Sequence, residues 1–299
     1  MTCNPKWPEI QNNLLPGQEA LDRPDVVARV FKLKKDQLIK DLTQGAIFGD
    51  CEAYLWVIEF QKRGLPHIHI LIILAQGQRP KTTQQVDNIV SAELPPNPNE
   101  HGITDEEKSR RKPLWDIVTS NMIHGPCGKD NPNSPCMKNA IDSKCPKKFP
   151  KPFFKGTIID DDMSHPIYRR RSPEDGGQTG IINFQTIDNR WVVPYNPYLS
   201  LRYTCHVNVE ICASAMASKY LYKYVTKGPD RAMVSTEVDD QPRDEIRDYE
   251  DMRSVGSSEA SWKIFSFPMA ENKPPVQVIK PFIILYLFIQ YFGGSSTTY

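Results

Sequence analysis

Hydrophobic residues recur along this chain with two different periods, and each period predicts a different element. Between Asp25 and Thr43 they return every three or four positions, which places them on one face of a helix. Segments 54–60 and 68–74 are instead rich in β-branched and aromatic residues, which favours strands. A turn-like piece, 61–66, joins these two segments, so the pattern predicts a β-hairpin.

The rest of the chain alternates between short periodic segments and stretches rich in proline, cysteine and charge. The order of strands, irregular insert, strands and helix predicts an α+β fold, with a mainly antiparallel central sheet, flanking helices and a Cys-rich irregular insert. The expected elements are a short helix at 82–93, a loop at 95–113, irregular structure at 121–152, strands at 181–185, 190–193 and 203–211, a helix at 213–227 and an acidic, poorly ordered stretch at 236–258.

The hairpin carries candidate metal ligands. His67 and His69 are separated by one residue, so both point to the same face of the strand while Ile68 points into the core. If Gln61 faces His67, then Glu59 faces His69 and the four polar side chains share that face. Two imidazoles and one oxygen ligand can chelate a divalent ion, with Glu59 and Gln61 both open as the third ligand. An isolated His-x-His is more often an ordinary strand fragment, but the matching polar partners favour the metal site.

Two tyrosines form a second candidate site. Tyr220 and Tyr224 are four residues apart, which on a helix places them one turn apart on one face. Lys223 and Lys227 each follow one of these tyrosines by three residues. Because a phenol has a pKa of about 10, neighbouring cations are needed to favour the nucleophilic phenolate. The alternative interpretation is a tyrosine-rich packing face.

The insert contains a candidate zinc site. His124, Cys127, Cys136 and Cys145 have the spacing H-x2-C-x8-C-x8-C. Zinc binds four such ligands, and short loops without a core of their own often depend on a metal. Since the later spacing is looser than C-x2-C, three reduced loop cysteines are the competing interpretation.

Charge is distributed unevenly, although the 299 residues carry a net charge of only +1. Segment 138–155 contains six lysines and one acid, whereas 237–251 contains eight acids and two arginines. A locally basic segment can follow a phosphate backbone while the whole chain stays near neutral. Phe149, Phe153 and Phe154 are candidates for base stacking beside it. The candidate DNA-binding residues are Lys144, Lys147, Lys148 and Lys151.

Several function classes are disfavoured. The chain has no GxxxxGK[ST] motif, so we expect no ATPase or helicase activity. Its polar, Pro-rich start does not resemble a signal peptide, and seven cysteines then indicate a reducing compartment. The apolar segment 282–292 is shorter than the roughly 20 residues that span a bilayer, so no membrane role is expected.

Three motifs together resemble one family. EFQKRGLPHIH at 59–69 is similar to the second motif of the Helitron replication-initiator domain, in the HUH (His-hydrophobic-His) nuclease superfamily. TCNP at 2–5 resembles its first motif and KYLYKYVTKG at 219–228 its third, and the similarity covers most of residues 2 to about 270. The resemblance implies an HUH nuclease-like fold with His67 and His69 as metal ligands, Tyr220 and Tyr224 as nucleophiles, and Lys223 and Lys227 as phosphate-binding support.

The resemblance also implies a function and a division of the chain. The function is a Mg²⁺- or Mn²⁺-dependent single-stranded DNA endonuclease and strand transferase, which forms a 5′-phosphotyrosine during rolling-circle transposition in the nucleus. The alternative is a truncated, catalytically dead transposon remnant that only binds single-stranded DNA, because the family's helicase module is not in this sequence. The expected parts are the metal-hairpin half at 1–95, the insert with its zinc site at 96–180, the tyrosine-helix half at 181–235, and an acidic linker and atypical tail at 236–299.

Overall fold

The structure is a computed structural model that describes most of the 299 residues. The tyrosine segment with Tyr220, Lys223, Tyr224 and Lys227 lies outside the described residues, as do the acidic stretch up to residue 254 and the apolar segment 282–292. The described residues are 1–45, 47–61, 64–129, 131–138, 144–160, 163, 165–182, 185–212 and 255–274.

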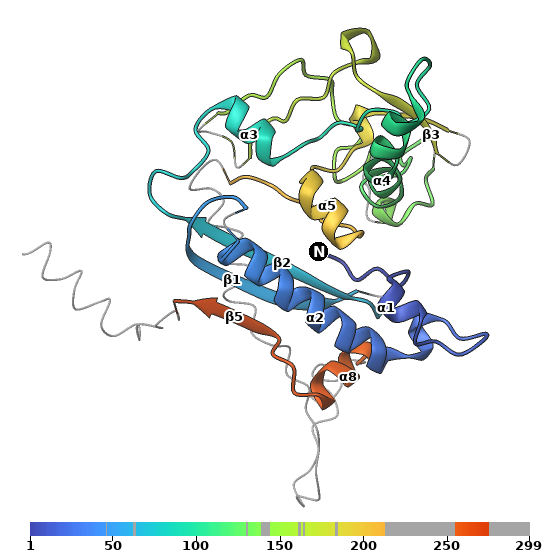
Figure 1. The fold of residues 1–299 in the computed structure, drawn as a ribbon, viewed down its shortest axis with the longest axis vertical. Helices are drawn as coiled ribbons and strands as arrows, with labels where there is room; N and C mark the ends of the chain where they lie inside the picture. The colour runs from blue at the N-terminus through green and yellow to red at the C-terminus, as the bar shows by residue number, and fades with distance from the viewer. Residues whose placement is uncertain are drawn as a thin grey trace, which may run out of the picture.

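The central sheet is antiparallel and has the strand order β2-β1-β5. The predicted hairpin is confirmed as β1 (Cys51–Phe60) and β2 (Pro66–Leu74). The third strand, β5 (Ala270–Lys273), pairs with the other edge of β1 and was not predicted. Together with the flanking helices this confirms the α+β class with a mainly antiparallel sheet (Figure 1).

One long helix covers the apolar face of this sheet. Helix α2 (Pro24–Thr43) confirms the predicted amphipathic segment and lies along the sheet in Figure 1. The short helices α1 (Pro8–Gln11) and α8 (Ser257–Ile264) also contact α2, and η1 (Ala20–Asp22) precedes it. The core between them is almost fully excluded from solvent and includes Trp7, Val27, Phe31, Leu38, Trp56, Ile58, Ile68 and Trp262.

The predicted register of the hairpin is wrong by two residues. Glu59 pairs with His67, and His69 pairs with Val57, whereas Gln61 lies beyond the end of β1. The reason is the turn, because Pro66 begins β2 rather than belonging to the loop. Gln61 instead belongs to the turn, where its N–H donates to the Leu65 carbonyl at 3.0 Å. Since the shift is an even number, every side chain keeps its predicted face.

A second part of the chain surrounds the two-stranded antiparallel sheet of β3 (Thr179–Ile182) and β4 (Gln185–Asp188). Its helices are α3 (Thr83–Ile89), α4 (Asp105–Asn121) and α5 (Pro197–Tyr203). Single 3-10 turns are η2 (Pro135–Met137), η3 (Pro173–Asp175) and η4 (Asn189–Trp191). No helix within the described ranges has the length and apolar character needed to cross a bilayer.

Four predictions for this second part are wrong. The single strand expected at 181–185 is instead the end of β3 and the start of β4. The loop expected at 95–113 contains the start of α4, because the Thr104 side chain accepts the Glu107 N–H and caps the helix. The first half of the strand expected at 190–193 belongs to η4, which is capped by Asp188, and Val192 forms only an isolated bridge to Ile123. The strand expected at 203–211 begins at the last residue of α5 and continues as a chain with one isolated bridge, between Asn208 and Tyr195.

Candidate functional site

The face of the hairpin that points away from the core carries one half-buried carboxylate and two half-buried imidazoles, which we call the histidine face: Glu59, His67 and His69. His69 Nε2 lies 3.0 Å from Glu59 Oε2, diagonally across the two strands. The His67 and His69 rings lie 4.6 Å apart between centroids. The opposite face holds Ile58 and Ile68, both almost fully buried. The hairpin therefore separates an apolar anchor from a polar surface, as the alternation predicts.

Residues 1–3 add a short antiparallel segment at the free edge of β2. The Ile68 N–H donates to the Met1 carbonyl at 2.9 Å, and the Cys3 N–H donates to the Pro66 carbonyl at 3.0 Å. This pairing sets Thr2 beside His67, with Thr2 Oγ1 2.6 Å from His67 Nδ1. When Nδ1 carries the proton and donates it to Thr2, His67 Nε2 keeps its lone pair for a ligand. Thr2 therefore belongs to the site, although its motif alone gave no such role.

The charge state of His67 suits a metal ligand. Burial, followed by the N-terminal amine, His69 and His206, lowers the pKa of His67 to about 2. The imidazole is consequently neutral at physiological pH, which is the form that coordinates metals.

Of the two candidates for the third ligand, only Glu59 contacts a histidine of this face. Gln61 is exposed, and its backbone N–H closes the turn. Glu59 sits within β1 and reaches His69. The geometry therefore favours Glu59 over Gln61, which the sequence left open.

The segment that leads toward the predicted tyrosine helix runs beside the histidine face. The Thr2 N–H donates to the His206 carbonyl at 2.9 Å, so this segment flanks the residue that holds His67. The His206 Nδ1 donates to the Asn121 carbonyl at 2.7 Å, consistent with a structural histidine. Tyr220 and Tyr224 themselves lie outside the described residues.

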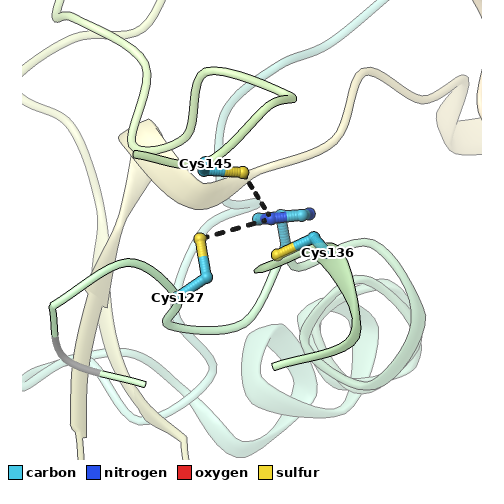
Figure 2. A group of neighbouring side chains, drawn as sticks. Cys127, Cys136 and Cys145 are labelled. Atoms are coloured by element: carbon cyan, nitrogen blue, oxygen red, sulfur yellow. Dashed lines mark hydrogen bonds between the residues drawn. The ribbon is translucent and has the colours of Figure 1, made fainter. Parts of the chain in front are cut away.

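The insert brings together four potential ligands, which we call the cysteine cluster: His124, Cys127, Cys136 and Cys145. Their ligand atoms all lie within 4.8 Å of one another. His124 Nε2 is 3.5 Å from Cys127 Sγ and 3.4 Å from Cys145 Sγ, and Figure 2 shows the three labelled thiols surrounding one space. In the described part of the chain no other group of His, Cys, Asp or Glu converges in this way, so the predicted Mg²⁺ or Mn²⁺ has no comparable ligand set.

The thiols of the cysteine cluster have opposite acid–base tendencies. Burial and hydrogen bonds with the neighbouring thiols raise the pKa of Cys127 to about 12. Burial also disfavours the Cys145 thiolate, but the backbone N–H groups of Phe149 and Lys147 and the other two thiols hold its pKa below the usual value. Of Cys127 and Cys145, the surroundings therefore favour deprotonation of Cys145.

The candidate DNA-binding lysines belong to residues 144–151, here called the basic turn. Lys144, Lys147 and Lys148 are exposed. Lys151 differs, because its Nζ donates to the Lys147 carbonyl at 2.9 Å and lies 5.0 Å from the Phe149 ring centroid. Burial lowers the pKa of Lys151. Three of the four lysines are therefore available to a polyanion.

Each of the three aromatic candidates beside the basic turn contacts another residue, through the ring of Phe149 and Phe153 and through the backbone of Phe154. Phe149 stacks on His124 with 4.3 Å between ring centroids. The Arg190 guanidinium lies 4.8 Å from the Phe153 ring centroid. The backbone of Phe154 pairs with that of Arg170. Base stacking on the Phe149 and Phe153 rings would have to use the faces left by these partners.

Comparison with known proteins agrees with the motif similarity in the first quarter of the chain. Residues 1–72 match the family model described as the Helitron helicase-like domain at the N-terminus. This match spans Thr2, Glu59, His67 and His69. No curated protein matches the chain.

Proposed function

Because residues 1–72 make this a Helitron-related protein, we propose that it is a metal-dependent endonuclease and strand transferase acting on single-stranded DNA. The observation that carries this proposal is the histidine face, where two half-buried imidazoles and a carboxylate share one face of the hairpin. A helicase-like family already implies association with nucleic acid.

The histidine face offers the donor types that a divalent cation takes, although its ligand atoms do not converge as those of the cysteine cluster do. His67 and His69 would bind it as neutral imidazoles and Glu59 as a carboxylate, in place of the contact that now joins Glu59 to His69. Thr2 would fix the ring orientation of His67 from behind, as partners of metal-bound histidines commonly do. The ion, Mg²⁺ or Mn²⁺, would polarise the scissile phosphate.

The covalent step is assigned to Tyr220 and Tyr224 by the motif similarity. The phenol of one tyrosine gives up its proton, and its oxygen bonds to phosphorus. The bond from phosphorus to the 3′ oxygen breaks, and that oxygen takes up a proton to become a 3′ hydroxyl. The 5′ phosphate stays on the tyrosine, which conserves the energy needed to join it to another strand. The second tyrosine permits a second cleavage, while Lys223 and Lys227 bind the phosphate.

The basic turn is proposed to bind the strand on either side of the cleaved phosphate. Its three exposed lysines would contact the backbone without regard to sequence. Action on chromosomal DNA would place the protein in the nucleus, and a helicase module would separate the strands that it cleaves.

A covalent-adduct assay tests the proposal directly. The full chain is incubated with 3′-end-labelled single-stranded DNA and Mn²⁺ or Mg²⁺, then denatured and resolved by electrophoresis, because the tyrosine keeps the fragment that carries the 3′ end. We expect a labelled protein band that chelation abolishes and that the double variant Tyr220→Phe/Tyr224→Phe does not form. Tyr222→Phe is the matched control, since its hydroxyl is not assigned to the reaction.

Two results would contradict the proposal. Salt-sensitive DNA binding without an adduct would indicate the binding-only remnant. An adduct that survives in the double variant would remove the tyrosine assignment.

A further inference from the structure

We propose that the cysteine cluster binds one structural Zn²⁺ and that this ion fixes the insert against β4 and η4. This inference is independent of the nuclease proposal, because it concerns residues 124–151 rather than the histidine face.

The distances between the ligand atoms suit a tetrahedral zinc ion. With Zn–S near 2.3 Å and Zn–N near 2.0–2.1 Å, tetrahedral geometry separates a nitrogen and a sulfur ligand by about 3.5 Å. His124 Nε2 lies 3.5 Å and 3.4 Å from the sulfurs of Cys127 and Cys145. Cys136 completes the set within the common limit of 4.8 Å.

The surroundings of the cluster resemble a second coordination shell. The backbone turns at Cys145, whose carbonyl accepts the Lys148 N–H at 2.8 Å. The Cys136 sulfur lies 3.1 Å from Ser134 Oγ. The Phe149 ring covers the His124 imidazole on one side. Each of these contacts limits the freedom of a ligand side chain.

The charge balance also favours an ion at this position. Zn²⁺ with three thiolates and a neutral imidazole has a net charge of −1, from +2 and −3. Lys147 and Lys151 follow Cys145 by two and six residues. Thiolates formed on zinc binding would be stabilised by the same lysines.

The insert needs such an ion because its own core is small. In the described part of residues 124–151, regular structure is limited to the single turn η2. Cys127, Met137 and Cys145 pack with Ile187 and Trp191 in one small apolar cluster. The His124 N–H also donates to the Trp191 carbonyl at 2.8 Å. A loop with this little buried surface gains its fixed structure from metal binding.

Zinc content of the purified full chain tests the site. The protein is made with His67→Ala/His69→Ala, so that the histidine face contributes no metal, and is purified under reducing conditions. We expect about one zinc per chain by mass spectrometry of the metal. Cys136→Ser should lose most of this zinc, whereas Cys51→Ser, a cysteine outside the cluster, should retain it. Cys136 is partly exposed, so its replacement perturbs packing least.

Cobalt substitution and thiol chemistry add readouts that do not depend on folding of one variant. Co²⁺ should give the visible absorption of a tetrahedral thiolate site, and Cys136→His should keep the metal but weaken the sulfur-to-cobalt bands. A folded chain without stoichiometric zinc would overturn the proposal. So would a Cys127–Cys145 disulfide in the freshly purified protein, or equal zinc loss from Cys51→Ser. None of these results depends on DNA cleavage, so they are distinguishable from failure of the nuclease proposal.

Discussion

Replacing Ile68 by alanine tests the arrangement on which the histidine face depends. Ile68 lies between the two histidines, is 1% exposed, and points into the core beneath α2. The substitution removes three carbons, worth about 2.4 kcal/mol of transfer free energy at about 0.8 kcal/mol each. The cavity that remains adds to this cost, and buried Ile→Ala changes fall between about 2 and 5 kcal/mol. We therefore expect the free energy of unfolding to drop by about 3 kcal/mol.

Ile73→Ala is the matched control for this prediction. Ile73 belongs to the same strand but to the face of the histidines, and it is 37% exposed. Its truncation leaves a site open to water, so the loss should be about 1 kcal/mol. Guanidinium-induced unfolding of both variants, with unchanged slopes, measures the two values. Equal losses, or a larger loss for Ile73, would mean that the hairpin presents the wrong face to the core and would refute the site.

Three further predictions concern the metal, the DNA and the pH dependence. Glu59→Gln should weaken Mn²⁺ binding by about 10-fold or more in calorimetric titration, while Gln61→Ala leaves it unchanged. A larger loss of affinity in Gln61→Ala would assign the third ligand to Gln61 instead. Lys147→Ala/Lys148→Ala should reduce the slope of log binding constant against log salt concentration for single-stranded DNA by about 1.4, at about 0.7 per phosphate contact. An unchanged slope would exclude the basic turn as a DNA contact. Burial raises the pKa of Glu93, but arginine hydrogen bonds bring it below the usual value. The ionised Glu93 carboxylate therefore adds to the free energy of unfolding above the unfolded pKa of about 4.3, and this contribution is lost as pH falls through the lower folded pKa. In Glu93→Gln, the free energy of unfolding should consequently fall less steeply as the pH is lowered.

The elements that the sequence predicted correctly are those whose side-chain pattern and burial agree. Helix α2 has one apolar stripe and β2 alternates between core and surface, so local periodicity was sufficient for both. Strand β5 has the sequence Ala-Glu-Asn-Lys and no such alternation. It exists because its backbone pairs with β1 at the sheet edge, where Tyr54 faces Lys273 and Val57 faces Ala270. Such a contact across more than 200 residues leaves no local signal.

Helix α4 shows how charge can hide an element. Its first turns are almost entirely charged and include Pro113, which the sequence pattern assigns to a loop. Thr104 caps the helix, and Arg111 forms ion pairs with Glu107 and Glu100 along its exposed side. Only the last turns carry apolar residues, of which Val118 is fully buried. Capping and ion pairing, rather than a continuous apolar stripe, therefore account for its start.

The candidate sites were predictable in their chemistry but not in their contacts. Side chains alternate between the two faces of a strand, so the face of His67 and His69 follows from the sequence alone. The residue that lies opposite each of them depends on the turn, and for this reason the register differs from the prediction while the face does not. Thr2 could not be identified, because its contact with His67 joins residues 65 positions apart. The cysteine cluster is the opposite case: its spacing was loose, yet the insert folds back on Trp191 and brings its ligands together. Ligand spacing is thus diagnostic only where one rigid element holds the residues, and in an irregular insert the ligands converge through tertiary packing.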